Sequence, residues 1–142
     1  MEMRIKRLTD TAILPTRAKA GDAGMDFYAD ESFTLHPMER RLASTGIAVQ
    51  LPVGTVGLVH PRSGLAHRDG ATVLNAPGTV DQGYRGEVKI NVINLGQDAL
   101  IIEAGDRIGQ MLVQKFETPA LVEVDTLDAS ERGDGGHGST GR

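Results

Sequence analysis

Three polar side chains, Asn75, Asp81 and Tyr84, lie close together in the glycine-rich stretch 73–87. An amide both donates and accepts hydrogen bonds, a carboxylate can act as a general base, and a tyrosine ring can stack on a sugar. The apolar residues and glycines of this stretch predict a folded-back β ribbon that places all three near bends. Such a ribbon suits a flat, edge-bonding ligand such as a pyrimidine. The alternative is that Asn, Asp and Gly serve only as turn residues.

A second group of candidates is the run Pro-Arg-Ser-Gly-Leu-Ala at 61–66, which contains Arg62, Ser63 and Gly64. We expect the one short helix of the chain to begin here. Unpaired backbone N–H groups at a helix start bind anions, and a neighbouring guanidinium strengthens such a site. The alternative is that Ser63 is a simple helix N-cap.

Two acids, Asp22 and Asp26, lie in a glycine-rich turn. They are either turn residues or the oxygens that hold hydrated Mg²⁺, an ion that keeps its waters and takes few protein ligands. Further along, Gln110 shares a face with Ile108 and Leu112 in an expected strand. Its amide is either solvated or directed at a polar partner.

Composition limits the classes of function. The chain has 142 residues, no cysteine and no tryptophan, and a formal net charge of −4. This length suits one domain with a core of its own, and the lack of cysteine excludes disulfides and thiolate catalysis. We expect no nucleic-acid partner, because such proteins need a basic face and stacking aromatics. We also expect no membrane span and a cytoplasmic location, since no apolar run of signal-peptide or membrane length occurs.

The elements that must position these residues are short strands. Apolar runs alternate with Gly, Pro, Asn and Asp turns, which is typical of an antiparallel sandwich, barrel or jelly roll. We therefore predict an all-β fold with one short helix, with a β domain over 1–124. The expected strands lie at 3–5, 47–51, 56–59, 88–93, 100–102, 108–116 and 121–124.

Residues 125–142 have a different composition, rich in Gly, Ser, Asp and Arg, which cannot bury enough apolar surface to order itself. This tail is either a plain flexible terminus or a lid that closes over phosphates with its backbone N–H groups and Arg132. Gly133 and Gly138 have the separation of a phosphate-binding P-loop, but Ser139 stands where the lysine should be, so we reject that motif.

Five segments, taken together and in this order, resemble the five motifs of the trimeric deoxyuridine triphosphatases (dUTPases). The likeness runs from Ala23 to Gly141. The segments are Ala-Gly-x-Asp at 23–26, Pro-Arg-Ser-Gly-Leu-Ala at 61–66, Gly-Thr-x-Asp-x-Gly-Tyr-x-Gly at 78–86, Arg-Ile-x-Gln at 107–110, and Arg-Gly-x-x-Gly-x-Gly-Ser-Thr-Gly at 132–141.

The resemblance implies a β jelly roll, or distorted β-barrel, that forms a homotrimer with a flexible C-terminal tail. Each of three active sites would contain the ribbon of one chain, the first, second and fourth segments of another, and the tail of the third. The implied reaction is the Mg²⁺-dependent hydrolysis of dUTP to dUMP and pyrophosphate. This reaction keeps uracil out of DNA and supplies dUMP for thymidylate synthesis.

The resemblance also implies roles for single residues. Asp81 would be the general base for a water that attacks the α-phosphorus, Asp26 would hold Mg²⁺ through water, and Arg132 and Gln110 would assist catalysis at the phosphates. The residues expected to bind substrate are Arg62, Ser63, Gly64, Asn75, Gly78, Thr79, Val80, Asp81, Tyr84, Lys89, Gln110, Arg132, His137, Gly138 and Ser139.

One position departs from the family pattern. Most members carry phenylalanine where this chain has His137, and that ring stacks on the uracil. A neutral imidazole can still stack, whereas a protonated one is better hydrated, so we expect closure of the lid to weaken at acidic pH.

The sequence leaves two rival functions open. A dCTP deaminase shares the fold and the Asp-x-Gly-aromatic ribbon, but its catalytic glutamate aligns with Asn91, an amide that cannot shuttle the proton. A non-enzymatic jelly-roll binding module is the second rival. In such a scaffold the carboxylate of Asp81 should cap a turn, with no cavity beside it.

Overall fold

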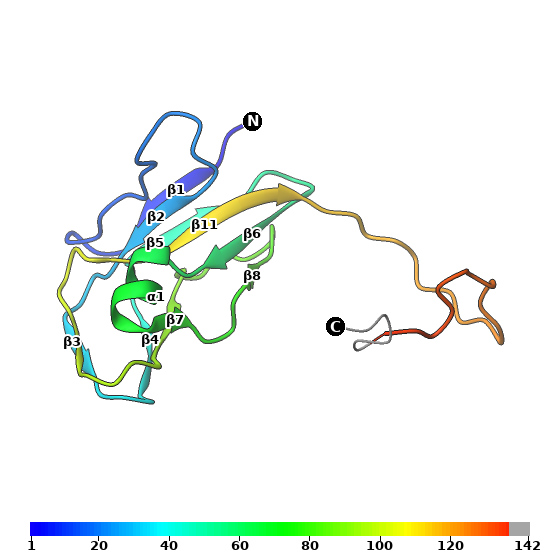
Figure 1. Ribbon diagram of the computed structural model, residues 1–142. Helices are drawn as coiled ribbons and strands as arrows, with labels where there is room; N and C mark the ends of the chain where they lie inside the picture. The colour runs from blue at the N-terminus through cyan, green and yellow to red at the C-terminus, as the bar shows by residue number, and fades with distance from the viewer. Residues whose placement is uncertain (137–142) are drawn as a thin grey trace.

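The computed structural model describes residues 1–136 of the chain as a β body followed by an extended C-terminal arm (Figure 1). Within this range no helix is long and apolar enough to cross a membrane. The elements are β1 (Arg4–Arg7), β2 (Met25–Tyr28), β3 (Phe33–Leu35), β4 (Arg40–Ala43), β5 (Ile47–Gln50), β6 (Thr55–His60), α1 (Ser63–Asp69), β7 (Ala71–Val73), β8 (Gly78–Val80), β9 (Ile90–Asn94), β10 (Leu100–Ile102) and β11 (Arg107–Lys115).

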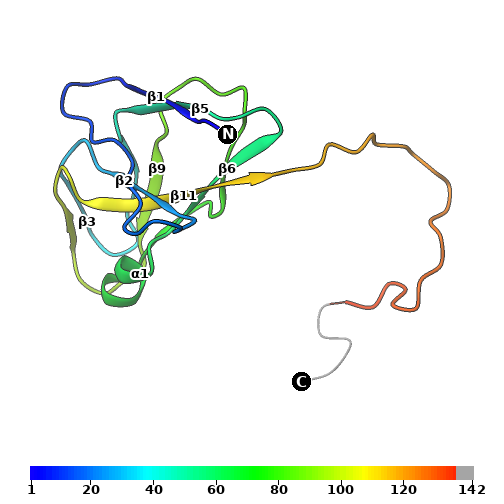
Figure 2. The ribbon, with the colours of Figure 1, turned by 90° about the horizontal axis from the view of Figure 1, so that it is seen from above.

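The strands pair antiparallel in four ladders. The largest has the order β2-β11-β6-β8, and the second has the order β4-β9-β7. Two further pairs, β1-β5 and β3-β10, complete the body. Most partners are far apart in the sequence, and β11, the longest strand, runs through the middle of the body (Figure 2). The all-β fold with one short helix that the sequence predicts is therefore confirmed.

Side chains from all four ladders meet in one apolar core. Phe27, Ile47, Ile90, Ile102 and Met111 come from five different strands, and each is at most 2% exposed. Strand β6 shows why the sequence folds in this way, because its burial alternates strictly from Thr55 to His60. One face of such a strand packs on the core, and the other is left for the surface or for a site.

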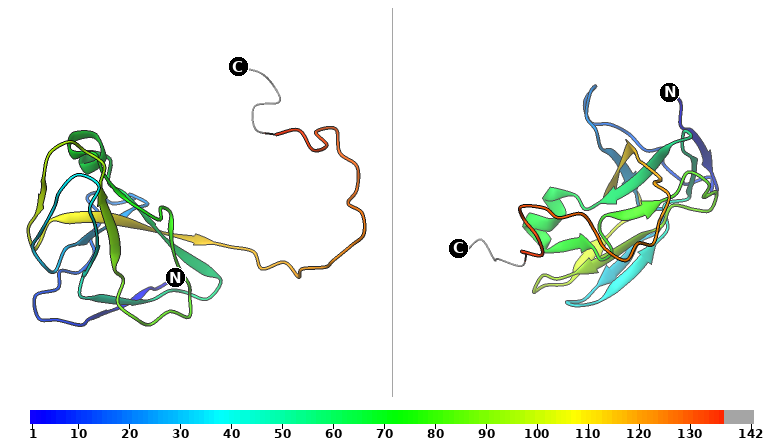
Figure 3. Two further views of the ribbon diagram at one scale, coloured as in Figure 1. Left: turned by 90° about the horizontal axis from the view of Figure 1, so that it is seen from below. Right: turned by 90° about the vertical axis from the view of Figure 1, so that its right-hand side faces the viewer.

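Most of the predicted strands are present, with bounds that differ by at most two residues, and the strand predicted at 100–102 coincides with β10. The predicted strand at 121–124 is wrong. The last strand ends at Lys115, and Leu121 is 97% exposed in the arm that leaves the body (Figure 3). An apolar run makes a strand only where another strand offers its backbone groups, and the described part of this chain offers none there.

The folded-back ribbon at 73–87 also needs correction. Strand β7 pairs with β9 in one ladder, whereas β8 pairs with β6 in another. The stretch therefore crosses between two ladders instead of pairing with itself. Because the turn at Asn75 to Gly78 joins the two ladders, its polar groups lie where the edges of both meet.

The short helix is confirmed, but its N-cap is not the one considered from the sequence. Arg62 occupies the N-cap position, and no side chain caps the helix start. Ser63 is thus the first helical residue, and its hydroxyl is not used as a cap. The helix ends at Gly70, whose φ of 68° is the left-handed conformation that glycine adopts most readily.

Candidate active site

The first candidate site is a cavity of about 350 Å³ that brings together three of the five sequence motifs; we call it the Asp26 pocket. Strand pairing explains this, because Gln110 on β11 lies opposite Asp26 on β2 and opposite His60 on β6. Arg62 follows His60 by two residues. The lining residues are Ala18, Asp22, Ala23, Gly24, Asp26, Arg62, Ser63 and Gln110.

Charge in the Asp26 pocket is arranged around one carboxylate. Arg62 donates from Nε to Oδ1 of Asp26 over 2.8 Å, and Nη1 of Arg107 lies 3.6 Å from Oδ2. The side chains of Arg62 and Asp26 are 23% and 14% exposed. None of the described residues accepts a hydrogen bond from the terminal nitrogens of Arg62. A guanidinium held in this way can still present those nitrogens to an anion such as a phosphate.

Gln110 is fixed in the same pocket. Its Nε2 donates to the carbonyl of Pro61 over 3.0 Å, so the amide is directed at a polar partner rather than solvated. A Cβ atom added at Gly24 would collide with Oε1 of Gln110. Glycine at this position therefore gives the amide its room.

Asp22 proves to be a turn residue. Its carboxylate accepts the backbone N–H of Lys19 over 2.9 Å, and its own N–H donates to the Lys19 carbonyl. This is the local hydrogen bonding that Asp makes in tight turns. Of the two acids that the sequence singles out, Asp26 is the one held among cations.

The second candidate site is a cavity of about 270 Å³ beside the end of β8; we call it the Asp81 pocket. The backbone carbonyl of Asp81 accepts the N–H of Tyr84 over 3.0 Å, which makes the turn. The carboxylate receives no hydrogen bond from any described residue, and it is exposed. The lining residues are Leu42, Thr79, Val80, Asp81, Tyr84, Glu87, Val88 and Lys89.

The state of Asp81 discriminates between two rival functions. A scaffold would use the carboxylate to cap its turn, but here a backbone bond and the Arg85 guanidinium hold the turn, and a cavity lies beside the Asp81 side chain. A carboxylate without a partner, at the edge of a cavity, is available to hold a water molecule. The geometry therefore favours a reactive site over a scaffold.

A smaller cavity of about 70 Å³ adjoins the Asp81 pocket, and both are lined by Thr79, Val80 and Lys89. Nδ2 of Asn75 would lie 3.3 Å from a Cβ added at Gly78, so the amide packs closely against the backbone there. Asn91, the residue that aligns with the deaminase glutamate, also lines this cavity. The walls are Val59, Val73, Asn75, Gly78, Thr79, Val80, Lys89, Ile90 and Asn91.

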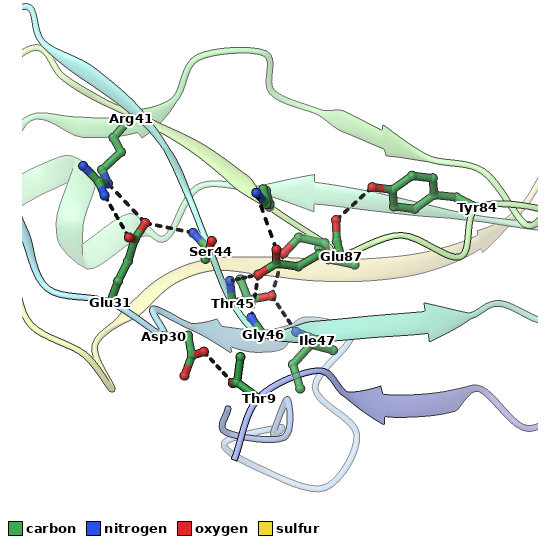
Figure 4. Close-up of polar contacts among 12 residues, drawn as sticks. Thr9, Asp30, Glu31, Arg41, Ser44, Thr45, Gly46, Ile47, Tyr84 and Glu87 are labelled. Carbon is green, nitrogen blue, oxygen red and sulfur yellow. Dashed lines mark hydrogen bonds and ion pairs between the residues drawn. The ribbon is translucent and has the colours of Figure 1, made fainter. Parts of the chain in front are cut away.

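Glu87 is a pocket residue that reasoning from the sequence missed. Its Oε1 accepts the backbone N–H groups of Thr45 at 3.1 Å and Gly46 at 2.8 Å (Figure 4). Its Oε2 lies 3.6 Å from Nζ of Lys89. The only feature of the sequence that could have indicated this role is a carboxylate at the C-terminal end of the ribbon. Its partners lie 41 and 42 residues away, where no local pattern points.

The predicted site residues thus fall into separate groups. The Asp26 pocket shares no lining residue with the Asp81 pocket or with the small cavity beside it. Gly64 lies in the first turn of α1 and does not line the Asp26 pocket. Arg132 lies in the arm, where its Nε donates to the carbonyl of Gly135. His137, Gly138 and Ser139 lie outside the described residues.

A metal ion would find few protein ligands here. The described residues contain no group of three or more His, Asp or Glu side chains that could hold one. The Asp26 pocket nevertheless suits a hydrated ion, because Oδ2 of Asp26 is 3.6 Å from Arg107, beyond hydrogen-bond length, and can accept from a metal-bound water. The residues present therefore fit Mg²⁺ held through water, with its other ligands supplied by a bound phosphate compound.

Comparison with known proteins gives consistent matches over nearly the whole chain. A family model described as dUTPase matches residues 10–141. The chain is 51% identical over 141 residues to the deoxyuridine 5'-triphosphate nucleotidohydrolase of Clostridium kluyveri, covering 99% of both chains. It is 55% identical over 138 residues to the protein of the same name from Nocardia farcinica, covering 96% of this chain and 84% of the relative.

Solved structures give the same result for the fold. The dUTPase of Staphylococcus bacteriophage 80alpha with dUPNHPP superposes with a TM-score of 0.93 at 30% identity, covering 99% of each chain. A variant of the dUTPase of phage phi11 of S. aureus, described as coordinating a structural Mg(II) ion, superposes with a TM-score of 0.84 at 26% identity. It covers 91% of this chain and 100% of the phage chain.

Proposed function

The chain belongs to the dUTPase family and hydrolyses dUTP to dUMP and pyrophosphate, and we propose that it does so in sites shared between the chains of a homotrimer. The observation that carries this proposal is that the two pockets lie toward opposite ends of β6 within one chain. Val80, next to Asp81, pairs with Gly57, whereas Asp26 pairs with Gln110, the partner of His60. A base and the phosphate that it serves must lie within reach of one another. Two half-sites on one chain meet this requirement when the pocket of one chain faces the pocket of the next.

The exposed arm supports the same assembly. Leu121 and Val122 are 97% and 76% exposed, and such residues gain most by packing against another chain. A closed ring of three copies would give every chain the same two contacts. We place the boundary between body and lid at 124, so that residues 125–142 of a third chain close over each site.

In the proposed reaction the carboxylate of Asp81 accepts a proton from a water molecule that it holds. The oxygen of this water forms a bond to the α-phosphorus, and the bond from that phosphorus to the bridging oxygen breaks. The electron pair leaves with pyrophosphate. The free state of the Asp81 carboxylate supports this role, and general-base catalysis contributes about 10² to 10⁴ in rate.

The Asp26 pocket would hold the phosphates. Arg62 presents its terminal nitrogens, Ser63 its hydroxyl, and the first turn of α1 the N–H of Gly64. Gln110 adds its amide beside them. Mg²⁺, when bound, would neutralise phosphate charge and align the chain of phosphates. Asp26 holds Arg62 in position and would accept hydrogen bonds from the waters of the ion.

The arm would complete the site. Arg132 would neutralise charge that develops on the phosphates, an effect worth about 10³ to 10⁵ in enzymes that use an arginine in this way. His137 would stack on the base, and the backbone of Gly138 and Ser139 would contact the phosphates. Closure of such a lid excludes water, and its opening releases product.

Selectivity would come from the cavity around Asn75. Backbone groups of Gly78 to Val80, together with the Asn75 amide, would pair with the edge of uracil. The close packing of Asn75 on Gly78 supports a wall that leaves no space for the methyl group of thymine. Cytosine would leave a buried donor unpaired, at a cost of about 1–3 kcal/mol. Tyr84 would lie under the deoxyribose and exclude a 2′-hydroxyl.

Mixing two inactive variants tests the shared site. Asp81→Asn inactivates only the half of the site that carries the base, and Arg62→Ala inactivates only the half that binds phosphates. If the two variants are unfolded together and refolded as mixed trimers, some sites combine an intact Asp81 with an intact Arg62. Random mixing in equal amounts predicts recovery of about a quarter of the wild-type rate of pyrophosphate release from dUTP.

Two controls make the mixing experiment decisive. Each variant refolded alone should stay inactive, and wild type carried through the same procedure should regain its rate. Mixed trimers that remain as inactive as the parents would contradict sites shared between chains, provided that sedimentation shows both variants in one particle.

A further inference from the structure

The C-terminal end of the ribbon, at Glu87, is attached to a distant turn by the Glu87 side chain. The turn between β4 and β5 consists of Ser44, Thr45 and Gly46. The backbone N–H of Thr45 and that of Gly46 both donate to Oε1 of Glu87, with N–O distances of 3.1 and 2.8 Å (Figure 4). The Glu87 side chain is 20% exposed, so water competes only weakly for these bonds. The carboxylate therefore fixes the end of the ribbon to the body.

The backbone of Glu87 holds the ring of Tyr84. The hydroxyl of Tyr84 donates to the Glu87 carbonyl over 2.9 Å. A Cβ added at Gly86 would lie 2.5 Å from that hydroxyl, so the ring packs directly on the Gly86 backbone. Glu87 thus joins the β4–β5 turn on one side to the aromatic floor of the Asp81 pocket on the other.

We propose that Glu87 is a positioning residue that sets the place of Tyr84 and thereby the discrimination between deoxyribose and ribose substrates. This inference rests on the proposed function, in which Tyr84 lies under the sugar. The Glu87 carboxylate accepts hydrogen bonds from two backbone N–H groups, so Glu87 acts on the substrate through Tyr84. Without the carboxylate the ribbon keeps its backbone bond to Ile47 and the bond from the Thr45 hydroxyl to the Val88 carbonyl, but it loses both N–H bonds to Glu87. The Glu87 carbonyl that holds the Tyr84 ring is then less firmly placed, and the ring can shift and admit a 2′-hydroxyl.

The same turn supplies a matched control. Glu31 accepts the N–H of Ser44 over 3.2 Å and pairs with Arg41 at 2.8 Å. It therefore holds the residue next to Thr45 with the same chemistry, but it lies outside the ribbon and contacts neither Tyr84 nor Glu87 in the described hydrogen bonds. Loss of Glu31 should loosen the turn without moving the Tyr84 ring.

The experiment measures kcat/KM for dUTP and for UTP in wild type, Glu87→Ala, Glu87→Gln and Glu31→Ala, with the melting temperature of each. We expect Glu87→Ala to lower the dUTP to UTP ratio about 10-fold or more, because small displacements at a site have large kinetic effects. Glu87→Gln keeps an oxygen that accepts from both N–H groups, so its ratio should stay near wild type. Glu31→Ala should lower the melting temperature and leave the ratio unchanged.

Three results would overturn the inference. Glu87→Ala could lower only the melting temperature, Glu31→Ala could lower the ratio equally, or Glu87→Gln could lose discrimination as fully as Glu87→Ala. The first would make Glu87 purely structural, the second would implicate the whole turn, and the third would implicate charge. A wild-type protein without activity on dUTP would be a separate outcome, because it overturns the proposed function first.

Discussion

Arg62 donates a hydrogen bond from Nε to Oδ1 of Asp26 over 2.8 Å, although the two residues are 36 positions apart in the sequence. The contact joins the loop after β6 to strand β2, with β11 between the two strands. One carboxylate therefore orients the guanidinium and keeps a second oxygen for other partners. Both activities proposed for the Asp26 pocket, phosphate binding and retention of Mg²⁺, depend on this pair.

Asp26→Asn should weaken the response to Mg²⁺. The amide keeps the shape and one acceptor but loses the charge that attracts metal-bound water, so we expect the Mg²⁺ concentration for half-maximal rate to rise about 10-fold or more. A Mg²⁺ titration of pyrophosphate release measures this. Asp22→Asn is the control, because the Asp22 carboxylate serves the turn at Lys19. Equal effects of the two variants would contradict the special role of Asp26.

Glu31 should make stability depend on acid pH. The hydrogen bonds from Arg41 hold the pKa of the Glu31 carboxyl below its ordinary value of 4.5. A lowered folded-state pKa means that the pair stabilises the protein at pH above 4.5, and that this stabilisation is lost as the pH falls through the lower value.

Glu31→Gln should therefore melt a few degrees below wild type at neutral pH, and the difference should shrink at the acid end of a pH series. The effect stays small because the Glu31 and Arg41 side chains are 30% and 47% exposed. Thermal unfolding of both proteins across the series checks this. A difference that stays constant with pH would show that the charge of Glu31 is not the cause.

Gly86→Ala should relax sugar selectivity with little loss of stability. The new Cβ would meet the Tyr84 hydroxyl at 2.5 Å, and the half-exposed ring can swing away only by giving up its bond to Glu87. We expect the ratio of kcat/KM for dUTP over UTP to fall about 10-fold. Gly83→Ala is the matched control in the same turn, because nothing lies within 4 Å of its Cβ. Identical ratios for the two variants would contradict the role of Tyr84 as a floor.

Deletion of residues 125–142 should lower the turnover of dUTP and leave the stability of the protein nearly unchanged. The described part of this segment has no strand and no buried residue, so the melting temperature should change little. Turnover of dUTP should fall about 10³-fold or more, since Arg132 is lost with the lid. A shortened protein that keeps most of its rate would rule out the lid, and a large drop in melting temperature would show that the arm belongs to the body.

The sequence predicts those parts of the structure that depend on local residue patterns. Alternation of apolar residues marks β6 and β11, because a strand shows every second side chain to the core. Helix α1 follows from the run after Pro61. Four of the five motifs supply lining residues to the two pockets, whereas the fifth lies in the arm and beyond the described residues.

Pairing between distant segments was beyond that reasoning. Alternation reveals which face of a strand is buried, but it carries no information on which strand lies beside it. For this reason the sequence predicts a ribbon folded back on itself over 73–87, although β7 pairs with β9 and β8 pairs with β6. The hydrogen bond from the Thr45 N–H to the Glu87 carboxylate could not be predicted for the same reason. Likewise, no sequence pattern shows that the turn after Asp81 is held by a backbone bond and by Arg85, which leaves the Asp81 carboxylate without a partner among the described residues.

Asp81 is the proposed base of a dUTP-specific hydrolysis. The most direct test measures pyrophosphate release with Mg²⁺ from dUTP, dCTP, dTTP and UTP, using wild type and Asp81→Asn, which keeps the shape and removes the base. We predict rapid release from dUTP alone and a loss of about 10² to 10⁴ in the variant, with an unchanged melting temperature. Equal rates for the two proteins would show that Asp81 is not the base, and release from the other nucleotides at the rate of dUTP would show that the site does not select dUTP.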